Sequence, residues 1–127
     1  MAPDTNTKKQ ILVVEDDKNM NDSLQRKFQG LGCETEGCFD GEQALIKMGE
    51  KTYDGIMMDL MMPIKDGFAV LAKKSTTKNP TTPVYVLTTL GEEKCELARE
   101  LGAKMTFIKS QMTAAQVIEE VKKDMGL

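Results

Sequence analysis

Acidic residues directly follow two apolar runs in this sequence. Glu15, Asp16 and Asp17 follow the apolar residues 11–14, and Asp59 follows a second apolar run. Carboxylates that are brought together repel one another unless a cation lies among them. Oxygen ligands without a histidine or thiolate partner suit Mg²⁺, with Mn²⁺ as the alternative. A carboxylate can also be a nucleophile and form an aspartyl phosphate, so these acids are candidates for metal binding and phosphoryl transfer.

A residue with a hydroxyl group and a residue with an ammonium group follow two further apolar runs. Thr88 follows residues 84–87, and Lys109 follows residues 105–108. The compact charge of a lysine can meet one phosphoryl oxygen, and the threonine hydroxyl can meet another. Together with Asp59, these groups match phosphoryl transfer by positioning and charge neutralisation.

Each of these residues, taken alone, has an ordinary structural explanation. A carboxylate at a strand end is often a helix N-cap, and we expect Asp17 to be one. A single lysine after a strand carries little information. The specific signal is the joint arrangement of acids, hydroxyl and ammonium across four strand ends.

The elements that must position these groups are five apolar runs alternating with five segments of helical periodicity. The expected strands are residues 11–14, 33–38, 53–60, 84–87 and 105–108. The expected helices carry apolar stripes that include Met20, Leu24, Phe28 and Leu31; Ala44, Leu45 and Met48; Val70 and Leu71; Leu97, Ala98 and Leu101; and Val117, Ile118, Val121 and Met125. Strict alternation predicts an α/β fold, a parallel sheet with helices on both faces. Ligands bind at the carboxyl ends of the strands in such sheets, where these polar groups would meet.

The helix starts have recognisable capping residues. Asp40 and Asp66 are placed to cap the second and third helices. Thr113 and Gln116 have the spacing of a capping box before the last helix. These signals place the helix boundaries independently of the apolar stripes.

Length, composition and charge are those of one globular domain. The chain has 127 residues, of which 40% are hydrophobic, and a net charge of −3. No basic cluster points to nucleic acid, and no apolar run approaches the roughly 20 residues of a membrane span. The polar start lacks a signal-peptide core. We therefore expect a disordered lead-in over residues 1–9, a domain over residues 10–127, and a cytoplasmic location.

The residue types that are scarce exclude several kinds of site. The sequence has no histidine, which disfavours zinc sites and triads that depend on histidine. Cys33 and Cys38 lie five residues apart in an expected strand, so their side chains should point to opposite faces of the sheet. We expect both, and Cys95, to be reduced thiols.

Three segments and one lysine together resemble the receiver domain of bacterial two-component response regulators, of the stand-alone type found in chemotaxis. They are residues 11–17 (ILVVEDD), 59–67 (DLMMPIKDG), 84–88 (VYVLT) and Lys109. The resemblance covers nearly the whole chain, from about Gln10. It implies a flavodoxin-like fold, a five-stranded parallel sheet of order 2-1-3-4-5 with five helices on both faces.

The resemblance also implies a role for each candidate residue. Asp59 would accept the phosphoryl group, and Thr88 and Lys109 would contact it. Mg²⁺ would be held by Asp16 directly, by Glu15 through water, by Asp59, and by the main-chain carbonyl of Met61. The last of these ligands could not have been proposed from side-chain chemistry.

The function implied by the resemblance is that of a signalling phosphoprotein in a phosphorelay, not of a classical enzyme. The donor would be a histidine kinase or a phosphotransfer protein. The domain would support its own phosphorylation and dephosphorylation. Phosphorylation would change a partner-binding face formed by the fourth helix, the fifth strand and the fifth helix. No output domain is recognisable in the sequence.

Three positions depart from the family's usual pattern. Ser110 follows Lys109 where proline is usual, Thr106 stands where an aromatic residue acts as a switch, and Thr89 stands where a smaller residue is common. A cis peptide before a non-proline residue costs about 2.5–4 kcal/mol, so we predict a trans peptide between Lys109 and Ser110. Without the aromatic residue, we predict that the signal passes through residues 88–101.

Other readings of the sequence remain open. The chain could be a pseudo-receiver, a module that binds proteins without being phosphorylated. A haloacid-dehalogenase-type phosphatase would need a second aspartate two residues after the nucleophile, where this sequence has Met61. A flavin-binding module of the same fold would need a phosphate-binding loop after the first strand, which the sequence lacks.

Overall fold

The computed structural model of the protein describes residues 8–127. Residues 1–7 of the expected lead-in lie outside the described part, and Lys8 and Lys9 have no regular secondary structure. The strands are β1 (Gln10–Val14), β2 (Glu34–Cys38), β3 (Gly55–Met58), β4 (Val84–Thr88) and β5 (Met105–Ile108). The helices are α1 (Lys18–Gly30), α2 (Gly41–Glu50), α3 (Gly67–Lys73), η1 (Lys74–Thr76, a 3₁₀ turn), α4 (Glu92–Glu100) and α5 (Ala114–Met125).

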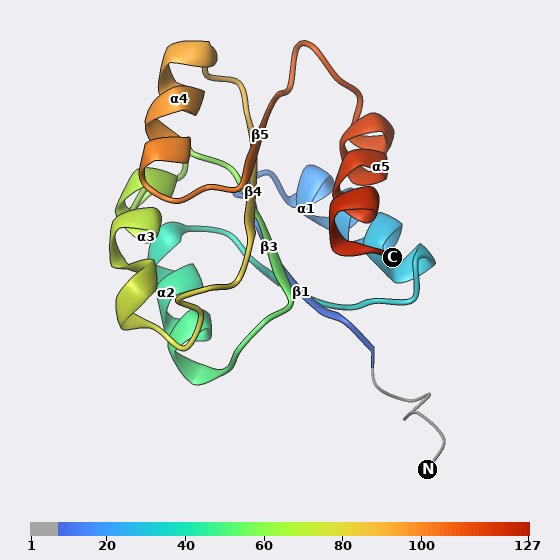
Figure 1. Cartoon of the computed structure of the whole chain (residues 1–127), viewed down its shortest axis with the longest axis horizontal. Helices are drawn as coiled ribbons and strands as arrows, with labels where there is room; N and C mark the ends of the chain where they lie inside the picture. The colour runs from blue at the N-terminus through green and yellow to red at the C-terminus, as the bar shows by residue number, and fades with distance from the viewer. Residues whose placement is uncertain (1–7) are drawn as a thin grey trace.

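The five strands form one parallel sheet of order β2-β1-β3-β4-β5. Helices α2, α3 and α4 cover one face, and α1 and α5 cover the other (Figure 1). This confirms the fold class and the strand order that were predicted. The order reverses between β1 and β3, which is where such sheets bind ligands.

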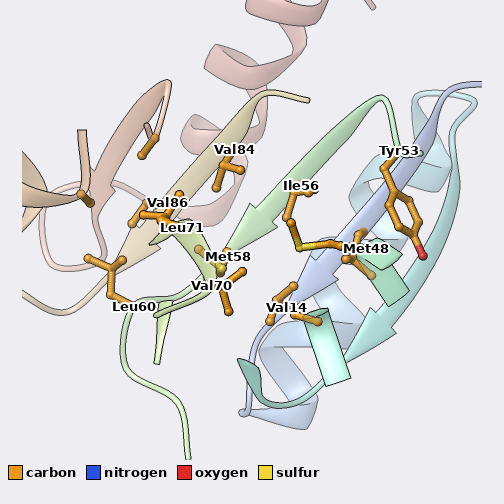
Figure 2. Close-up of a cluster of buried hydrophobic side chains, with 14 of the residues drawn as sticks. Val14, Met48, Tyr53, Ile56, Met58, Leu60, Val70, Leu71, Val84 and Val86 are labelled. Carbon is orange, nitrogen blue, oxygen red and sulfur yellow. The ribbon is translucent and has the colours of Figure 1, made fainter. Parts of the chain in front are cut away.

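Two apolar cores fill the spaces between the sheet and its two layers of helices. Alternate side chains of a strand point to opposite faces, so Leu12 and Val14 lie in the core under α2, α3 and α4, while Ile11 and Val13 lie in the other. Figure 2 shows the first core. Because β1, β3 and β4 are buried on both faces, their sequences are continuous apolar runs.

The third strand is shorter than the predicted residues 53–60. The N–H group of Tyr53 donates to Asn79 Oδ1 at 2.7 Å, so this group binds a loop and not a neighbouring strand. At the other end, the carbonyl of Leu60 accepts from the N–H group of Gly67 at 2.9 Å. Hydrogen bonds to residues outside the sheet therefore replace strand pairing at Tyr53 and at Leu60, and the strand is confined to residues 55–58.

The helix caps follow the predictions. The side chains of Asp17, Asp40 and Asp66 accept hydrogen bonds from backbone N–H groups in the first turns of α1, α2 and α3. Thr113 and Gln116 form the complete capping box of α5. Short polar side chains at these positions satisfy N–H groups that have no partner inside the helix.

The buried face of α4 differs from the predicted stripe of Leu97, Ala98 and Leu101. Cys95 and Ala98 are buried, whereas Leu97 and Leu101 are among the exposed large hydrophobic residues. Small side chains therefore form the buried face of α4, and the larger leucines lie at the surface. The periodicity found the helix and the buried Ala98 correctly but placed Leu97 and Leu101 on its inner face wrongly.

The cysteines behave as predicted. Cys33 and Cys38 lie in different cores, and both they and Cys95 are buried and free. Among the described residues, no helix has the length and apolar character needed to cross a membrane.

Candidate functional site

Three of the predicted acids and the predicted lysine meet at the carboxyl edge of the sheet. Glu15, Asp16 and Asp59 each offer a carboxylate oxygen, and these oxygens lie within 4.8 Å of one another. Lys109 Nζ donates to Glu15 Oε1 at 2.7 Å and to Asp59 Oδ2 at 3.0 Å. Glu15 and Asp59 are only 2% and 5% exposed, whereas Asp16 is exposed.

The sheet itself places these residues. Val14 pairs with Met58 across β1 and β3, so the next residue of each strand reaches the same level. Beyond the strand ends, the N–H group of Asp59 donates to the carbonyl of Val14 at 3.0 Å, and that of Lys109 to the carbonyl of Thr88 at 2.7 Å. The backbone ladder therefore continues to the first residue after the strands and fixes these side chains at one edge.

Burial and charge make Glu15 an unusual carboxyl group. Burial raises its pKa from the ordinary 4.5 to about 7. The hydrogen bond from Lys109 opposes this shift, and the negative charge of Asp59 adds to it. For Lys109, burial by itself would lower the pKa, but the hydrogen bonds to Glu15 and Asp59 and the negative charges of these two acids together outweigh burial and raise the pKa above the ordinary 10.5.

The donor set fits a hard divalent cation. Three carboxylates share the positive charge of one lysine, so the cluster keeps an excess of negative charge that a cation would relieve. All three side-chain donors are oxygens, which Mg²⁺ prefers and which Mn²⁺ also accepts. Histidine and thiolate donors are not part of the cluster.

Asp16 and Asp17 have different roles although they are adjacent. Asp17 Oδ1 accepts from the N–H groups of Asn19 at 2.9 Å and Met20 at 3.1 Å, which makes it the N-cap of α1. Asp16 is the one of the two that joins the acidic cluster. The N-cap predicted at Asp17 is confirmed, and the metal-binding role of Asp16 stays a prediction.

The remaining predicted site residues, Thr88 and Met61, lie beside the cluster without joining it. Thr88 is fully buried, and its hydroxyl accepts from the N–H group of Leu90 at 3.2 Å. Met61 is exposed; its N–H group donates to Asp59 Oδ1 at 3.2 Å, and its sulfur lies 3.6 Å from the hydroxyl of Thr89. The loops after β3 and β4 thus touch each other beside Asp59.

A mostly apolar cavity of about 650 Å³ opens next to the cluster. It is lined by Asp16, Leu60, Met61, Met62, Pro63, Asp66, Phe68 and Leu90. Because Asp16 belongs to both the cavity and the cluster, a molecule in the cavity would lie beside the acids.

The loop between β3 and α3 packs tightly against the residues that follow β3. A Cβ atom at Gly67 would lie 2.7 Å from the carbonyl oxygen of Asp59, so only glycine fits. Ile64 has a φ of +71°, and the N–H group of Lys65 donates to the carbonyl of Pro63 across it at 2.8 Å. A β-branched residue in this region is strained, and the strain lies within the loop that borders the site.

Two supporting residues were missed by the sequence reasoning. Gly67 could have been suspected, since a glycine after the capping Asp66 begins a helix where a better helix former would be expected. Asn21 could also have been noticed, because it occupies the buried stripe of α1 with Leu24 and Phe28. An amide at an apolar position is a signal of a buried polar contact.

At Ser110 and Thr106, two of the positions that depart from the family pattern, the structure shows a trans peptide and a hydrogen bond to α4. No peptide bond within residues 8–127 is cis, so the predicted trans peptide after Lys109 is confirmed. Thr106 Oγ1 accepts a hydrogen bond from Arg99 of α4, and Arg99 also pairs with Glu92. Phe107 lies in the core next to α5.

Comparisons with known proteins agree with this geometry. A family model described as the response regulator receiver domain matches residues 11–122. The transcriptional activator protein PfeR of Pseudomonas aeruginosa is 33% identical over 84 residues, which are 66% of this chain and 27% of PfeR. The chain spans less than half the length of the curated relatives that it matches.

Solved structures resemble the chain over almost its full length. The receiver domain of the Francisella response regulator 1452 has a TM-score of 0.82 and 30% identity, covering 93% of this chain and 97% of that domain. The receiver domain of the sensor histidine kinase PA1611 from Pseudomonas aeruginosa has a TM-score of 0.80 and 23% identity, covering 95% and 100%. That structure has a magnesium ion coordinated in its active-site cleft, and at this identity the likeness shows the fold alone.

Proposed function

The chain belongs to the response regulator receiver domain family, and from this premise we propose that it accepts a phosphoryl group on Asp59. Receiver domains are signalling acceptors and not classical enzymes. The observation that carries the proposal is the buried carboxylate of Asp59, hydrogen-bonded to Lys109 and within 4.8 Å of two further acids.

In the proposed reaction, a carboxylate oxygen of Asp59 attacks the phosphorus of a phosphohistidine on a kinase or phosphotransfer protein. The phosphorus–nitrogen bond breaks, the imidazole leaves with its electron pair, and an acyl phosphate forms on Asp59. Lys109 donates to Asp59 Oδ2 at 3.0 Å, and this contact supports the proposal that its ammonium would bind a phosphoryl oxygen. The hydroxyl of Thr88, which accepts from the N–H group of Leu90, would donate its own hydrogen to a second phosphoryl oxygen, a charged and therefore strong acceptor.

The residues that would hold Mg²⁺ are Asp16, Asp59, the main-chain carbonyl of Met61 and, through water, Glu15. When bound, the ion supplies neutralisation of the charge on the phosphoryl oxygens. The oxygen-only cluster supports this assignment; the PA1611 receiver, which has the same fold, has a magnesium ion coordinated in its active-site cleft. Mn²⁺ would be accepted at the same ligands.

The proposed partners are a donor protein at the acidic edge and a target protein on the face formed by α4, β5 and α5. The route between them would begin at Thr88 and pass through its loop into α4. Arg99 supports this route, because it links the first turn of α4 at Glu92 to β5 at Thr106. A histidine kinase would meet the domain in the cytoplasm, where ATP is available.

The proposal is tested by labelling with a small phosphodonor. Acetyl phosphate with Mg²⁺ should add the mass of one phosphoryl group to the wild-type chain, and Asp59→Asn should remove the labelling. Asp66→Asn is the matched control, because Asp66 is an acid of the same loop that caps α3. A wild-type chain that binds Mg²⁺ but stays unlabelled would indicate a pseudo-receiver, and equal labelling of Asp59→Asn would place the acceptor elsewhere.

A further inference from the structure

Asn21 is a buried polar residue of α1 that the proposed chemistry does not use. It is 1% exposed. Its Nδ2 donates to the carbonyl of Cys38 at 2.9 Å and to that of Glu15 at 3.0 Å, and it lies 3.4 Å from the carbonyl of Val13. One side chain thus joins α1 to the carboxyl ends of both β1 and β2.

The bond to Glu15 concerns the peptide that connects two acids of the site. The carbonyl of Glu15 belongs to the planar peptide shared with Asp16. Within residues 8–127, no backbone N–H group outside the regular elements donates to that carbonyl. The amide of Asn21 therefore fixes the orientation of the peptide from which both carboxylates project.

The surroundings of Asn21 fix its own orientation. Its Oδ1 accepts from Gln25 Nε2 at 2.6 Å, and Gln25 in turn accepts from the hydroxyl of Thr35 at 2.9 Å. A Cβ atom at Gly37 of β2 would lie 2.7 Å from Asn21 Oδ1 and 2.3 Å from Gln25 Nε2. The strand has a glycine at the one place where the two amides approach it, so the donor end of Asn21 is held toward the site.

We propose that Asn21 is a positioning residue of the acidic site, which sets the relative placement of the Glu15 and Asp16 carboxylates and thereby the affinity for Mg²⁺. The inference rests on the proposed function. Residues that orient metal ligands without touching the metal typically change affinity by about 10–100-fold when they are removed. A purely structural Asn21 would change stability alone.

The chain contains a matched control for that distinction. Asn79 is also 1% exposed. It donates to the carbonyls of Met48 and Lys51, both at 2.8 Å, and accepts from the N–H group of Tyr53 at 2.7 Å. Asn79 joins loops at the amino ends of the strands, at the opposite end of the sheet from the acidic site. It therefore matches Asn21 in burial and in hydrogen bonding to carbonyls but makes no hydrogen bond to the acids.

The experiment compares Mg²⁺ binding by Asn21→Ala and Asn79→Ala with that of the wild type, by calorimetric titration at a temperature where circular dichroism shows each variant folded. Asn21→Ala should weaken binding about tenfold or more, and Asn79→Ala should leave it unchanged within about twofold. Labelling of Asp59 in Asn21→Ala should be slow at low Mg²⁺ and recover at saturating Mg²⁺, because β3 and β5 place Asp59 and Lys109.

A milder variant covers the case in which Asn21→Ala does not fold. Gln25→Ala removes the donor that orients Asn21 and should weaken Mg²⁺ binding by about two- to fivefold, less than the change of about 10–100-fold expected when a residue that orients a ligand is itself removed. Unchanged affinity in Asn21→Ala, or in Gln25→Ala if the first variant is unfolded, would overturn the inference. An equal loss in Asn79→Ala would do the same. Failure of the wild type to bind Mg²⁺ would instead overturn the proposed function.

Discussion

The two ends of the sheet bury polar groups in opposite ways. At the carboxyl end, Glu15 and Asp59 are buried as acids, share the ammonium of Lys109 and have Asp16 beside them. At the amino end, the buried groups are neutral. Asn79, Thr82 and the backbone of Tyr53 are connected by hydrogen bonds of 2.7 to 3.1 Å.

The two ends differ in whether their buried polar groups are balanced by partners within the chain. Every hydrogen bond of the amino-end network is made within the chain, so the network ties loops together and requires nothing more. The carboxyl end has more negative charge than its lysine can balance, and burial holds that charge away from water. Buried groups that the chain leaves unbalanced are the ones available to bind a cation or a phosphoryl group.

The largest expected effect is a dependence of stability on pH that originates at the carboxyl end. Glu15 has a pKa of about 7 in the folded chain against an ordinary 4.5, so the folded state binds more protons between these values. Stability should therefore fall as pH rises from 4.5 to 7, by up to about 3 kcal/mol, and level off above. Urea denaturation with a chelator between pH 5 and 8 measures this, and Glu15→Gln should flatten the curve. A wild-type curve that rises with pH over this range would contradict the prediction.

The second effect separates two adjacent acids. Asp16→Ala should weaken Mg²⁺ binding on the order of a hundredfold, about 2.7 kcal/mol, because Asp16 belongs to the cluster. Asp17→Ala should change the affinity only mildly and instead cost about 1 kcal/mol of stability as a lost N-cap. Metal titrations and denaturation of both variants give the two numbers. The division of roles fails if the two variants lose the same affinity.

The smallest effect tests the neutral end. Asn79→Ala leaves the N–H group of Tyr53 and two carbonyls without their partner, which should cost about 2 kcal/mol of unfolding free energy. The loss should be the same at pH 5 and pH 8, and the same with and without Mg²⁺, because no charge of the site is involved. A loss that grows with pH would show that the two ends are coupled. Denaturation at the two pH values provides this comparison.

The sequence by itself determined the features that depend on local order along the chain. The apolar runs and stripes predicted five strands and five helices, and the caps at Asp40, Asp66 and Thr113 were predicted from residue type and spacing. Parallel strands must bring their ends to one edge. The meeting of Glu15, Asp59 and Lys109 was therefore predictable from their places behind apolar runs.

Only the tertiary structure decided which hydrogen bonds and pKa shifts these groups have at the edge of the sheet. Lys109 hydrogen-bonds to acids that are 94 and 50 residues away in the sequence, and the raised pKa of Glu15 depends on burial by surrounding elements. The positioning of Asn21 and the exposure of Leu97 likewise depend on which neighbours pack against α1 and α4. Periodicity gives the spacing of side chains along one element, whereas desolvation and hydrogen-bond partners are set by elements that the chain brings together only on folding.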